Sequence, residues 1–377
     1  MKQISTSAGL AKNRLLPEVP LVSPHAFAYK WTLADANFTK DKGKVFSCFA
    51  CGGGSTMGYK LAGFDVIGHN DIDKKMIEVY KANHNPKFSF LESITTFAKR
   101  KDLPTELYNL DILDGSPPCS SFSMAGNREK DWGKKKVFRE GQAEQVLDTL
   151  FFDFIDLAKE LQPKVVVAEN VKGLLMGEAK AYVRKIYAEF NKAGYYCQHF
   201  LLDASKMGVP QRRERVFFIS LRKDLATPFL YQQDLFTVNP KLELLFNEKK
   251  IIFGEIIDDQ DNLETLSLLD GFLWDKRIIG DIDLCDISLR ERKVLSRFNA
   301  KFIYKHKVSN TITAVEQCVL FDKKRNRNKS ELLQCGSYPK DYNFLINKTE
   351  YLIGMSVPPV MTAQIAKKVY EQWLSKL

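Results

Sequence analysis

The chain has 377 residues, 45% of them hydrophobic and 27% charged, with a formal net charge of +10. This composition is that of a folded protein rather than a disordered one, and the length predicts one large domain with a smaller one. The excess of 56 Lys and Arg over 46 Asp and Glu favours a polyanionic partner, although solubility alone also accounts for such a charge.

Cysteine usage and hydropathy indicate the compartment. The seven cysteines have no regular spacing, which argues against a disulfide scaffold and for a reducing environment. The N-terminus lacks a secretory pattern, and no stretch approaches about 18 consecutive apolar residues. We therefore expect a cytoplasmic protein without a membrane partner.

Alternating strands and helices begin after an N-terminal extension, residues 1–43, that shows no periodicity. Apolar runs predict strands at 45–50, 64–70, 110–113, 164–168 and 215–221. Amphipathic or capped segments predict helices at 55–62, 74–83, 145–161, 182–193 and 361–377. This alternation predicts an α/β fold with a parallel, doubly wound sheet.

The charge pattern changes after residue 223. Residues 231–285 carry 12 Asp and Glu against 5 Lys and Arg, whereas residues 286–330 carry 12 Lys and Arg against 4 Asp and Glu. A reversal from −7 to +8 indicates a different surface role and a second domain. We expect the basic segment to face a polyanion and the acidic segment to face away from it.

A glycine-rich turn follows the first predicted strand. Gly52, Gly53 and Gly54 let a ligand approach the backbone closely, and Asp71 ends the second strand, where a carboxylate can accept hydrogen bonds from a ribose. We call residues 49–54 the glycine turn. It predicts a nucleoside-type cofactor, whereas the alternative is a tight turn without a ligand.

A cysteine stands just beyond the strand at 110–113. Cys119 follows two prolines that fix the backbone, in the run Ser116-Pro117-Pro118-Cys119. A structural cysteine needs no such turn, so Cys119 is a candidate nucleophile.

Two further strands carry charged residues at an end. The strand at 164–168 leads into Glu169 and Asn170, where a carboxylate can act as a general acid. Arg212, Arg213 and Arg215 stand at the start of the strand at 215–221, just before its apolar run from Val216, where guanidinium groups can clamp a phosphate or a base edge. A helix-terminal pair and a solvated charge cluster are the respective alternatives.

Together these segments resemble the C5-cytosine DNA methyltransferase family. The matching segments are, in the family's order, Phe49–Gly54 with Gly58 and Gly63; Ser116–Cys119 with Phe122, Ser123 and Gly126; Glu169–Val171; Gln211–Arg215; and Gly354 with Ser356–Pro359. They span residues 45–223 and about 309–377. Cys51 stands where the family usually has a glycine, and Gln334 stands where it usually has an arginine.

The resemblance implies a Rossmann-like S-adenosylmethionine-dependent methyltransferase sheet and a smaller target-recognition domain. The catalytic domain would comprise residues 44–223 and 340–377, and the recognition domain residues 224–339. The implied reaction is methylation of cytosine C5 in a specific duplex DNA sequence after base flipping. Cys119 would attack C6 of the base.

The resemblance also implies the roles of individual residues. Glu169 would hold N3 of the base, Arg215 would hold O2, and Arg213 would brace the loop or the backbone. The implied cofactor contacts are Phe49, Gly52, Gly53, Gly54, Asp71, Ile72, Glu92, Pro117 and Ser356. The expected DNA contacts are Ser120, Ser123, Arg128, Lys323, Lys324, Arg325 and Arg327. No metal site is expected.

Duplex DNA is the implied partner, with a restriction endonuclease for the same site as a further candidate and a monomer as the expected state. The resemblance to the bacterial type of this family also implies a protein of a bacterial cell or one encoded by a phage. A tRNA cytosine methyltransferase of the same fold is an alternative, as is a non-catalytic DNA-binding homologue. A zinc deaminase is disfavoured because Phe122 stands where its second cysteine would be. Cys48 and Cys51 form a C-x-x-C pair, but the glycines after it disfavour an oxidoreductase.

Overall fold

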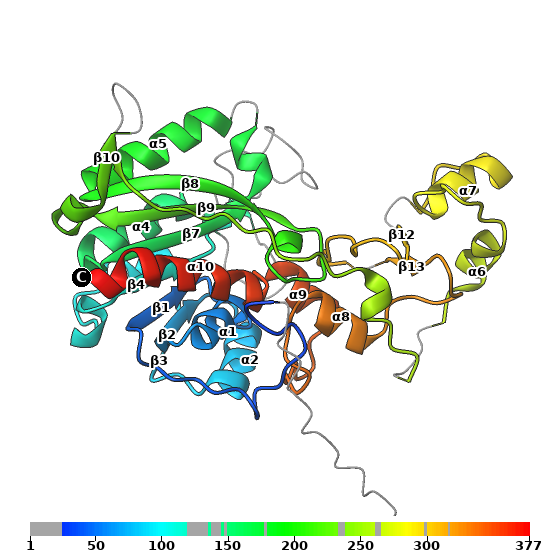
Figure 1. Cartoon of the computed structure of the whole chain (residues 1–377), viewed down its shortest axis with the longest axis horizontal. Coiled ribbons are helices and arrows are strands. Elements are labelled where there is room, and N and C mark those ends of the chain that lie inside the picture. Colours follow the sequence, from blue (N-terminus) through cyan, green and yellow to red (C-terminus); the bar gives the residue numbers. More distant parts are fainter. Residues whose placement is uncertain are drawn as a thin grey trace, which may run out of the picture.

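A computed structural model of the chain describes residues 25–118, 149–176, 179–232, 238–260, 265–297, 300–315 and 317–377, and the backbone of two short strands, β5 and β6. A seven-stranded sheet forms the centre of the larger lobe (Figure 1). Its strands, in spatial order, are β3 (Phe88–Leu91), β2 (Asp65–Asp71), β1 (Lys44–Cys48), β4 (Ile112–Gly115), β7 (Val165–Val171), β9 (Glu214–Arg222) and β8 (Tyr195–Asp203).

The five strands from β3 to β7 are parallel, as predicted. Helices provide the crossovers that parallel strands require. These are α1 (Gly54–Leu61), α2 (Lys74–His84), α3 (Ile94–Phe97) and α4 (Leu150–Leu161). Asp73 caps α2 by accepting hydrogen bonds from the amides of Lys75 and Met76, which explains why the helix begins there.

The prediction of an all-parallel sheet is wrong at one edge. β9 is antiparallel to both β7 and β8, so the sheet is mixed. Only residues 204–213 join β8 to β9, and they contain one short 3₁₀ helix. A connection of this length is too short for a parallel crossover, which needs a dozen or more residues. The sequence pattern also missed β3 and β8.

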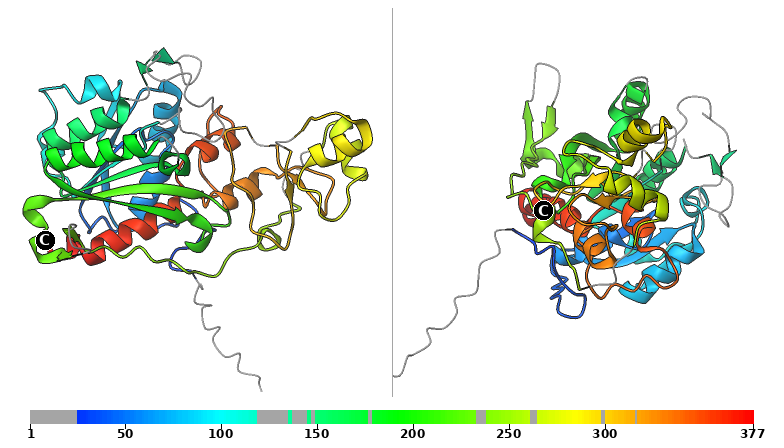
Figure 2. Two further views of the ribbon diagram at one scale, coloured as in Figure 1. Left: turned by 90° about the horizontal axis from the view of Figure 1, so that it is seen from above. Right: turned by 90° about the vertical axis from the view of Figure 1, so that its right-hand side faces the viewer.

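Each face of the sheet has its own hydrophobic core, because successive strand residues point to opposite faces. Phe46 and Leu113 pack with α4 and with α5 (Ala179–Lys192). Val45 and Ile112 pack with α1 and with α10 (Pro359–Gln372). Figure 2 shows α4 and α5 on one side of the sheet and α10 on the other. The C-terminal helix predicted at 361–377 corresponds to α10, which packs on one face of the sheet.

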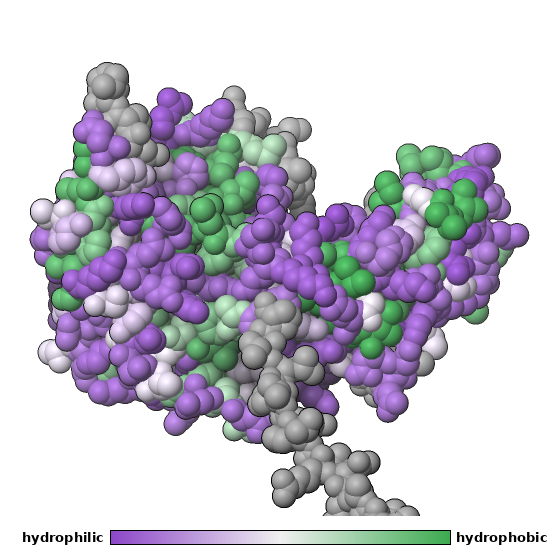
Figure 3. Space-filling view, viewed as in Figure 1, coloured by the Kyte–Doolittle hydropathy of each residue, from purple (hydrophilic) through white to green (hydrophobic). Residues whose placement is uncertain are grey.

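A smaller lobe has its own core and lies to the right in Figure 1. We call the described residues within 265–321 the small lobe. Its core joins α6 (Leu268–Asp275), α7 (Leu284–Arg292), β12 (Phe302–Ile303) and β13 (Val319–Leu320). Hydrophobic residues gather on part of its surface (Figure 3), and Leu268 and Ile279 are 97% and 91% exposed.

The boundaries predicted for the recognition domain, 224–339, include segments that pack with the larger lobe. Leu242 and Leu244 belong to the core beneath α10. A third core joins Ile251 and Phe253 to the helices at 329–335 and 349–355. The remaining elements are α8 (Lys329–Cys335), α9 (Thr349–Met355), the antiparallel pair β10 (Leu230–Gln232) and β11 (Val238–Pro240), and the antiparallel pair β5 (Lys135–Lys136) and β6 (Gln145–Val146).

The described part of the predicted N-terminal extension, residues 25–43, packs against the C-terminal part of the chain. The Trp31 indole donates to the Ser337 carbonyl at 2.9 Å, and the Leu33 amide donates to the Asp341 carboxylate at 2.7 Å. Within the described residues, none of the helices has the length and apolar composition needed to cross a bilayer.

Candidate active site

Four neighbouring parallel strands, β2, β1, β4 and β7, end at one edge of the sheet. The register aligns Cys48 at the end of β1 with Gly115 of β4, and Gly115 with Ala168 of β7. The strands are buried along their length, but side chains at or just beyond these ends are partly exposed. These are Phe49, Ile72, Ser116 and Glu169. The carboxyl edge of parallel strands is the usual ligand side of such a sheet.

Glu169 and Arg215 form an ion pair at this edge. Arg215 Nε lies 2.9 Å from Glu169 Oε1, and the two side chains are 17% and 15% exposed. The antiparallel pairing of β7 with β9 produces this contact, since Arg215 pairs with Val171, two residues beyond Glu169. The structure therefore brings together two of the residues that the sequence placed in one site.

Asn170 connects the same edge to the segment that leads to the candidate nucleophile. Its Nδ2 donates to the Pro117 carbonyl at 3.1 Å, and its Oδ1 accepts from the Val171 amide. Asn170 and Pro117 are both buried. Cys119, Ser120, Ser123 and Arg128 lie outside the described residues, so their placement stays a prediction.

Arg213, for which the resemblance implied bracing of the loop or the backbone, lies in the interior. It is 2% exposed, and its guanidinium donates to the Ile312 carbonyl at 3.0 Å and to the Gly354 carbonyl at 2.7 Å. Burial lowers the pKa of this guanidinium below its usual value. Gln211, which begins the matching segment but was assigned no role, also contacts Ile312 by accepting a hydrogen bond from its amide.

Asp71 holds the backbone of the glycine turn. Its carboxylate accepts from the Cys51 amide and from the Asp73 amide, each at 2.8 Å. It is 9% exposed, and burial raises its pKa to about 6. Asp71 thus lies at the predicted strand end and also has a structural role that the sequence did not reveal.

The glycines of this turn are needed for contact with the protein itself. A Cβ on Gly52 would lie 2.1 Å from Leu352 of α9, and one on Gly53 would lie 2.4 Å from His84 of α2. A Cβ on Gly54 would lie 2.6 Å from the Val357 carbonyl. Protein atoms fill the space that these Cβ atoms would occupy, so the glycines permit close packing of the chain here; the approach of a ligand to the turn stays a prediction.

The other predicted cofactor residues lie around this turn with partners of their own. Glu92, just beyond β3, pairs with Arg100 at 2.9 Å, and its amide donates to the Asp71 carbonyl. Ser356 is buried, and its hydroxyl donates to the Leu352 carbonyl at 2.7 Å. Phe49 and Ile72 are partly exposed.

Sequence reasoning missed Asp114, a buried carboxylate in β4. It is 4% exposed and accepts hydrogen bonds from three hydroxyl groups. Burial raises its pKa to about 6. The signal was a charged residue inside an apolar strand, five positions before Cys119.

Two of the predicted DNA contacts are corrected by the structure. Arg325 is 5% exposed and binds the fully buried Glu331 through two hydrogen bonds of 2.7 and 2.8 Å. Arg327 is 2% exposed and donates to the Ser309 hydroxyl at 2.6 Å. Both guanidinium groups are committed to the interior, so they do not present a surface to phosphates.

Lys323 and Lys324 are partly exposed, but each is paired with the acidic segment. Lys323 contacts Asp259, and Lys324 lies 2.5 Å from Asp275. Asp259 and Asp275 of the acidic segment therefore lie against lysines of the basic segment. Their role as DNA contacts stays a prediction.

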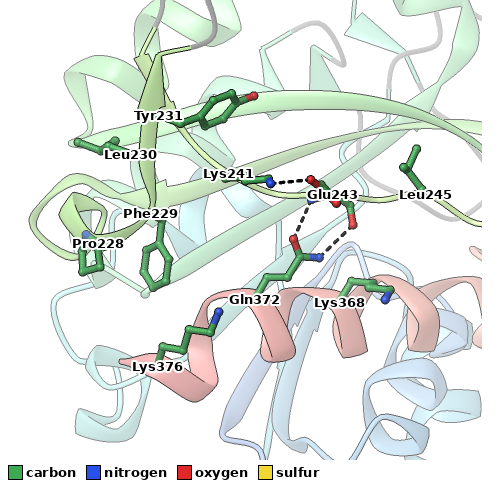
Figure 4. A pocket seen from close by; sticks show the side chains of 10 residues that line it. All are labelled: Pro228, Phe229, Leu230, Tyr231, Lys241, Glu243, Leu245, Lys368, Gln372 and Lys376. Atoms are coloured by element: carbon green, nitrogen blue, oxygen red, sulfur yellow. Dashed lines mark hydrogen bonds and ion pairs between the residues drawn. The ribbon is translucent and has the colours of Figure 1, made fainter.

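A hollow of about 620 Å³ lies away from this edge, between β10, the segment at 241–245 and the end of α10 (Figure 4). In it Lys241 pairs with Glu243, whose backbone bonds Gln372. No predicted site residue lines it, so we place the candidate site at the strand ends.

Comparisons with known proteins identify relatives of this chain. Over 216 residues the chain is 33% identical to the type II methyltransferase M.NgoPII of Neisseria gonorrhoeae, covering 57% of this chain and 56% of that protein. It is 37% identical to M.FnuDI of Fusobacterium nucleatum over 48% of each chain. The match thus spans about half the length of these relatives. M.NgoFVII of Neisseria gonorrhoeae is 26% identical over 89% of each chain.

Solved structures share the fold. A putative DNA modification methyltransferase from an Escherichia coli prophage superposes with a TM-score of 0.58 at 20% identity, covering 87% of this chain and 99% of that one. The DNMT2 mutant of Spodoptera frugiperda gives the same TM-score and coverage at 18% identity. The sequence profile of the C-5 cytosine-specific DNA methylases matches residues 43–371, and the chain therefore belongs to that family.

Proposed function

We propose that this protein methylates C5 of cytosine in a specific duplex DNA sequence, using S-adenosylmethionine. The observation that carries the proposal is the joint placement of the Glu169–Arg215 ion pair and the Asn170–Pro117 hydrogen bond at the strand ends. These contacts connect a carboxylate, a guanidinium group and the segment leading to Cys119. Family membership and type II relatives support the same reaction class.

The residues at the glycine turn fit the cofactor. Asp71 ends β2 with a carboxylate beside the turn, and the neighbouring Phe49 and Ile72 are partly exposed. A carboxylate suits a ribose diol, and an apolar or aromatic surface suits an adenine. S-adenosylmethionine, when bound, supplies an electrophilic methyl group.

The chain's own residues would prepare the base. Cytosine C5 is a poor nucleophile, and addition of the Cys119 thiolate to C6 makes the ring enamine-like. Glu169 donates a proton or a hydrogen bond to N3 of the base. This allows the ring to take up the electron density that the sulfur supplies as it adds to C6. Arg215 holds O2, and Arg213 braces the strand that carries it. After methylation, loss of the C5 proton and release of the thiolate restore the aromatic ring.

Base flipping would bring the cytosine to these groups, because C6 is not accessible to them inside a duplex. A restriction endonuclease acting on the same sequence is a candidate partner, since M.NgoPII and M.FnuDI are named type II methyltransferases. We expect the protein to act as a monomer.

Two experiments test the proposal. Bisulfite sequencing of DNA from a host that expresses the protein should reveal C5-methylcytosine in one sequence context. Duplex DNA with 5-fluorocytosine at that site should form a denaturation-resistant complex with the wild type but not with Cys119→Ser, because fluorine cannot leave as a cation. Methylation of tRNA in place of DNA would assign the substrate to RNA. Methylated DNA without a trapped complex would exclude the covalent route.

A further inference from the structure

One buried carboxylate contacts the elements on both sides of the glycine turn. Asp114 Oδ2 accepts from Ser47 Oγ at 2.7 Å and from Ser55 Oγ at 2.9 Å, and Oδ1 accepts from Tyr59 Oη at 3.1 Å. Ser47 lies in β1, which leads into the turn, and Ser55 and Tyr59 lie in α1, which follows it. The carboxylate therefore connects three elements.

Asp114 itself belongs to the strand that leads to the candidate nucleophile. It is the third residue of β4, and Cys119 follows five positions later in the sequence. The next residue, Gly115, lies against Phe154 of α4, where a Cβ would come within 2.6 Å of the ring. The end of β4 is thus fixed from one side by Asp114 and from the other by α4.

An ionised carboxylate does something here that an amide would not. It only accepts hydrogen bonds, so it fixes all three hydroxyl groups as donors. An asparagine of nearly the same shape could donate to two of those oxygens, and the hydroxyl groups could rotate to suit. Retaining a buried charge at this position is unfavourable for stability. This points to a use of the charge other than folding.

We propose that Asp114 is a positioning residue that holds the start of α1, and with it the glycine turn, against the end of β4 that leads to Cys119. The proposal rests on the proposed function, because it assumes that S-adenosylmethionine binds at the glycine turn. In this role the carboxylate touches neither the cofactor nor the base. It keeps the cofactor-binding turn and the end of β4 in a fixed relation.

The titratable groups around Asp114 allow its effect to be isolated. They are Cys48 on β1, Tyr59 on α1, Tyr80 on α2 and Glu169 on β7. Burial raises the pKa of the thiol and of both phenols, so these three stay neutral through the neutral range. Glu169 is paired with Arg215. Asp71, beside the turn, has a pKa that burial raises to about 6, so it titrates together with Asp114.

The test is the ratio of the cofactor dissociation constants of Asp114→Asn and wild type, measured by calorimetry from about pH 5 to about pH 8. Asp71 is present in both proteins, so its titration cancels in the ratio. Near pH 8 the variant should bind S-adenosylmethionine about fivefold more weakly, as expected for loss of about one hydrogen bond's worth of free energy. Near pH 5, where Asp114 is protonated, the ratio should approach one.

If the charge serves positioning, Asp114→Asn should lower cofactor affinity without lowering thermal stability. A pKa raised on folding means that ionised Asp114 destabilises the native state as the pH rises through about 6. Asp114→Asn should therefore unfold at the same or a higher temperature than wild type at pH 8, while binding the cofactor less well. A purely structural carboxylate would make stability and affinity fall together.

Tyr59→Phe provides a second variant that keeps the charge and removes one hydrogen bond. It should weaken cofactor binding about two- to fivefold. Tyr195→Phe is the matched control, because its buried hydroxyl bonds the Pro163 carbonyl far along the sheet. It should leave affinity unchanged.

A ratio that stays constant across the pH range, or unaltered affinity in both Asp114→Asn and Tyr59→Phe, would overturn the inference while leaving the proposed function intact. A wild type that binds no S-adenosylmethionine and methylates no nucleic acid would overturn the proposed function instead.

Discussion

The ion pair of Arg325 with Glu331 tests whether this arginine belongs to the interior or to a DNA surface. Glu331 is fully buried, and besides the two bonds from Arg325 it accepts from the amides of Asn328 and Asp258 at 3.0 and 3.1 Å. Arg325→Ala would leave this carboxylate without its counter-charge. Breaking such a buried pair reduces the free energy of unfolding by about 3–5 kcal/mol.

The assay is thermal and urea unfolding of Arg325→Ala beside Lys323→Ala. A loss of about 3–5 kcal/mol should lower the Tm by roughly 4–6 °C for a chain of this size. Lys323 is in an exposed pair, so its removal should change stability by at most about 1 kcal/mol. Arg325→Met combined with Glu331→Leu should recover stability, because it removes both charges. An Arg325→Ala variant with wild-type Tm and weaker DNA binding would refute this reasoning and restore the phosphate contact.

Three further predictions concern the candidate site. Asp71→Ala should weaken S-adenosylmethionine binding about 10- to 150-fold in calorimetry. The affinity of the wild type for the cofactor should also fall as the pH drops below about 6. Burial raises the Asp71 pKa to about 6, and the protonated carboxyl group loses acceptor capacity. In Asp71→Asn the affinity should change less with pH over this range. Cys51 has a left-handed backbone with a φ of 48°, which glycine adopts without strain. The free energy of unfolding of Cys51→Gly should therefore be about 1 kcal/mol higher than that of Cys51→Ala. Equal free energies of unfolding would contradict the strain. Arg213→Met should reduce stability by about 2–4 kcal/mol, whereas the exposed Arg212→Ala should not, and similar losses in chemical denaturation would disprove the brace.

The parallel half of the sheet could be predicted because its sequence signals are local. Apolar runs such as 164–168 end in charged residues, and Gly52–Gly54 marks the turn between β1 and α1. The antiparallel edge could not be predicted in this way, since β8 carries alternating side chains that give no continuous apolar run. Strand direction depended on the short link between β8 and β9.

The site residues divide in the same way. Glu169 and Arg215 stand at strand ends, and their approach follows from the pairing of β7 with β9. The partners of Arg213 are 99 and 141 residues away along the chain, so no local pattern reveals that it binds their carbonyls. The space beside Gly52 is likewise filled by Leu352, a contact that only the tertiary fold creates.

The net charge of a segment is a poor guide to its surface here, because residues of the acidic segment 231–285 contact residues of the basic segment 286–330. Lys323 and Arg325 both contact Asp259, and Lys324 contacts Asp275. Residues 231–330 carry a net charge of only +1, so +9 of the chain's +10 lies outside them. If the protein binds DNA as proposed, long-range attraction should come mainly from the rest of the chain, because opposite charges within a few ångströms cancel at a distance. The salt dependence of DNA binding should then respond more to lysines outside residues 231–330 than to Lys323 and Lys324.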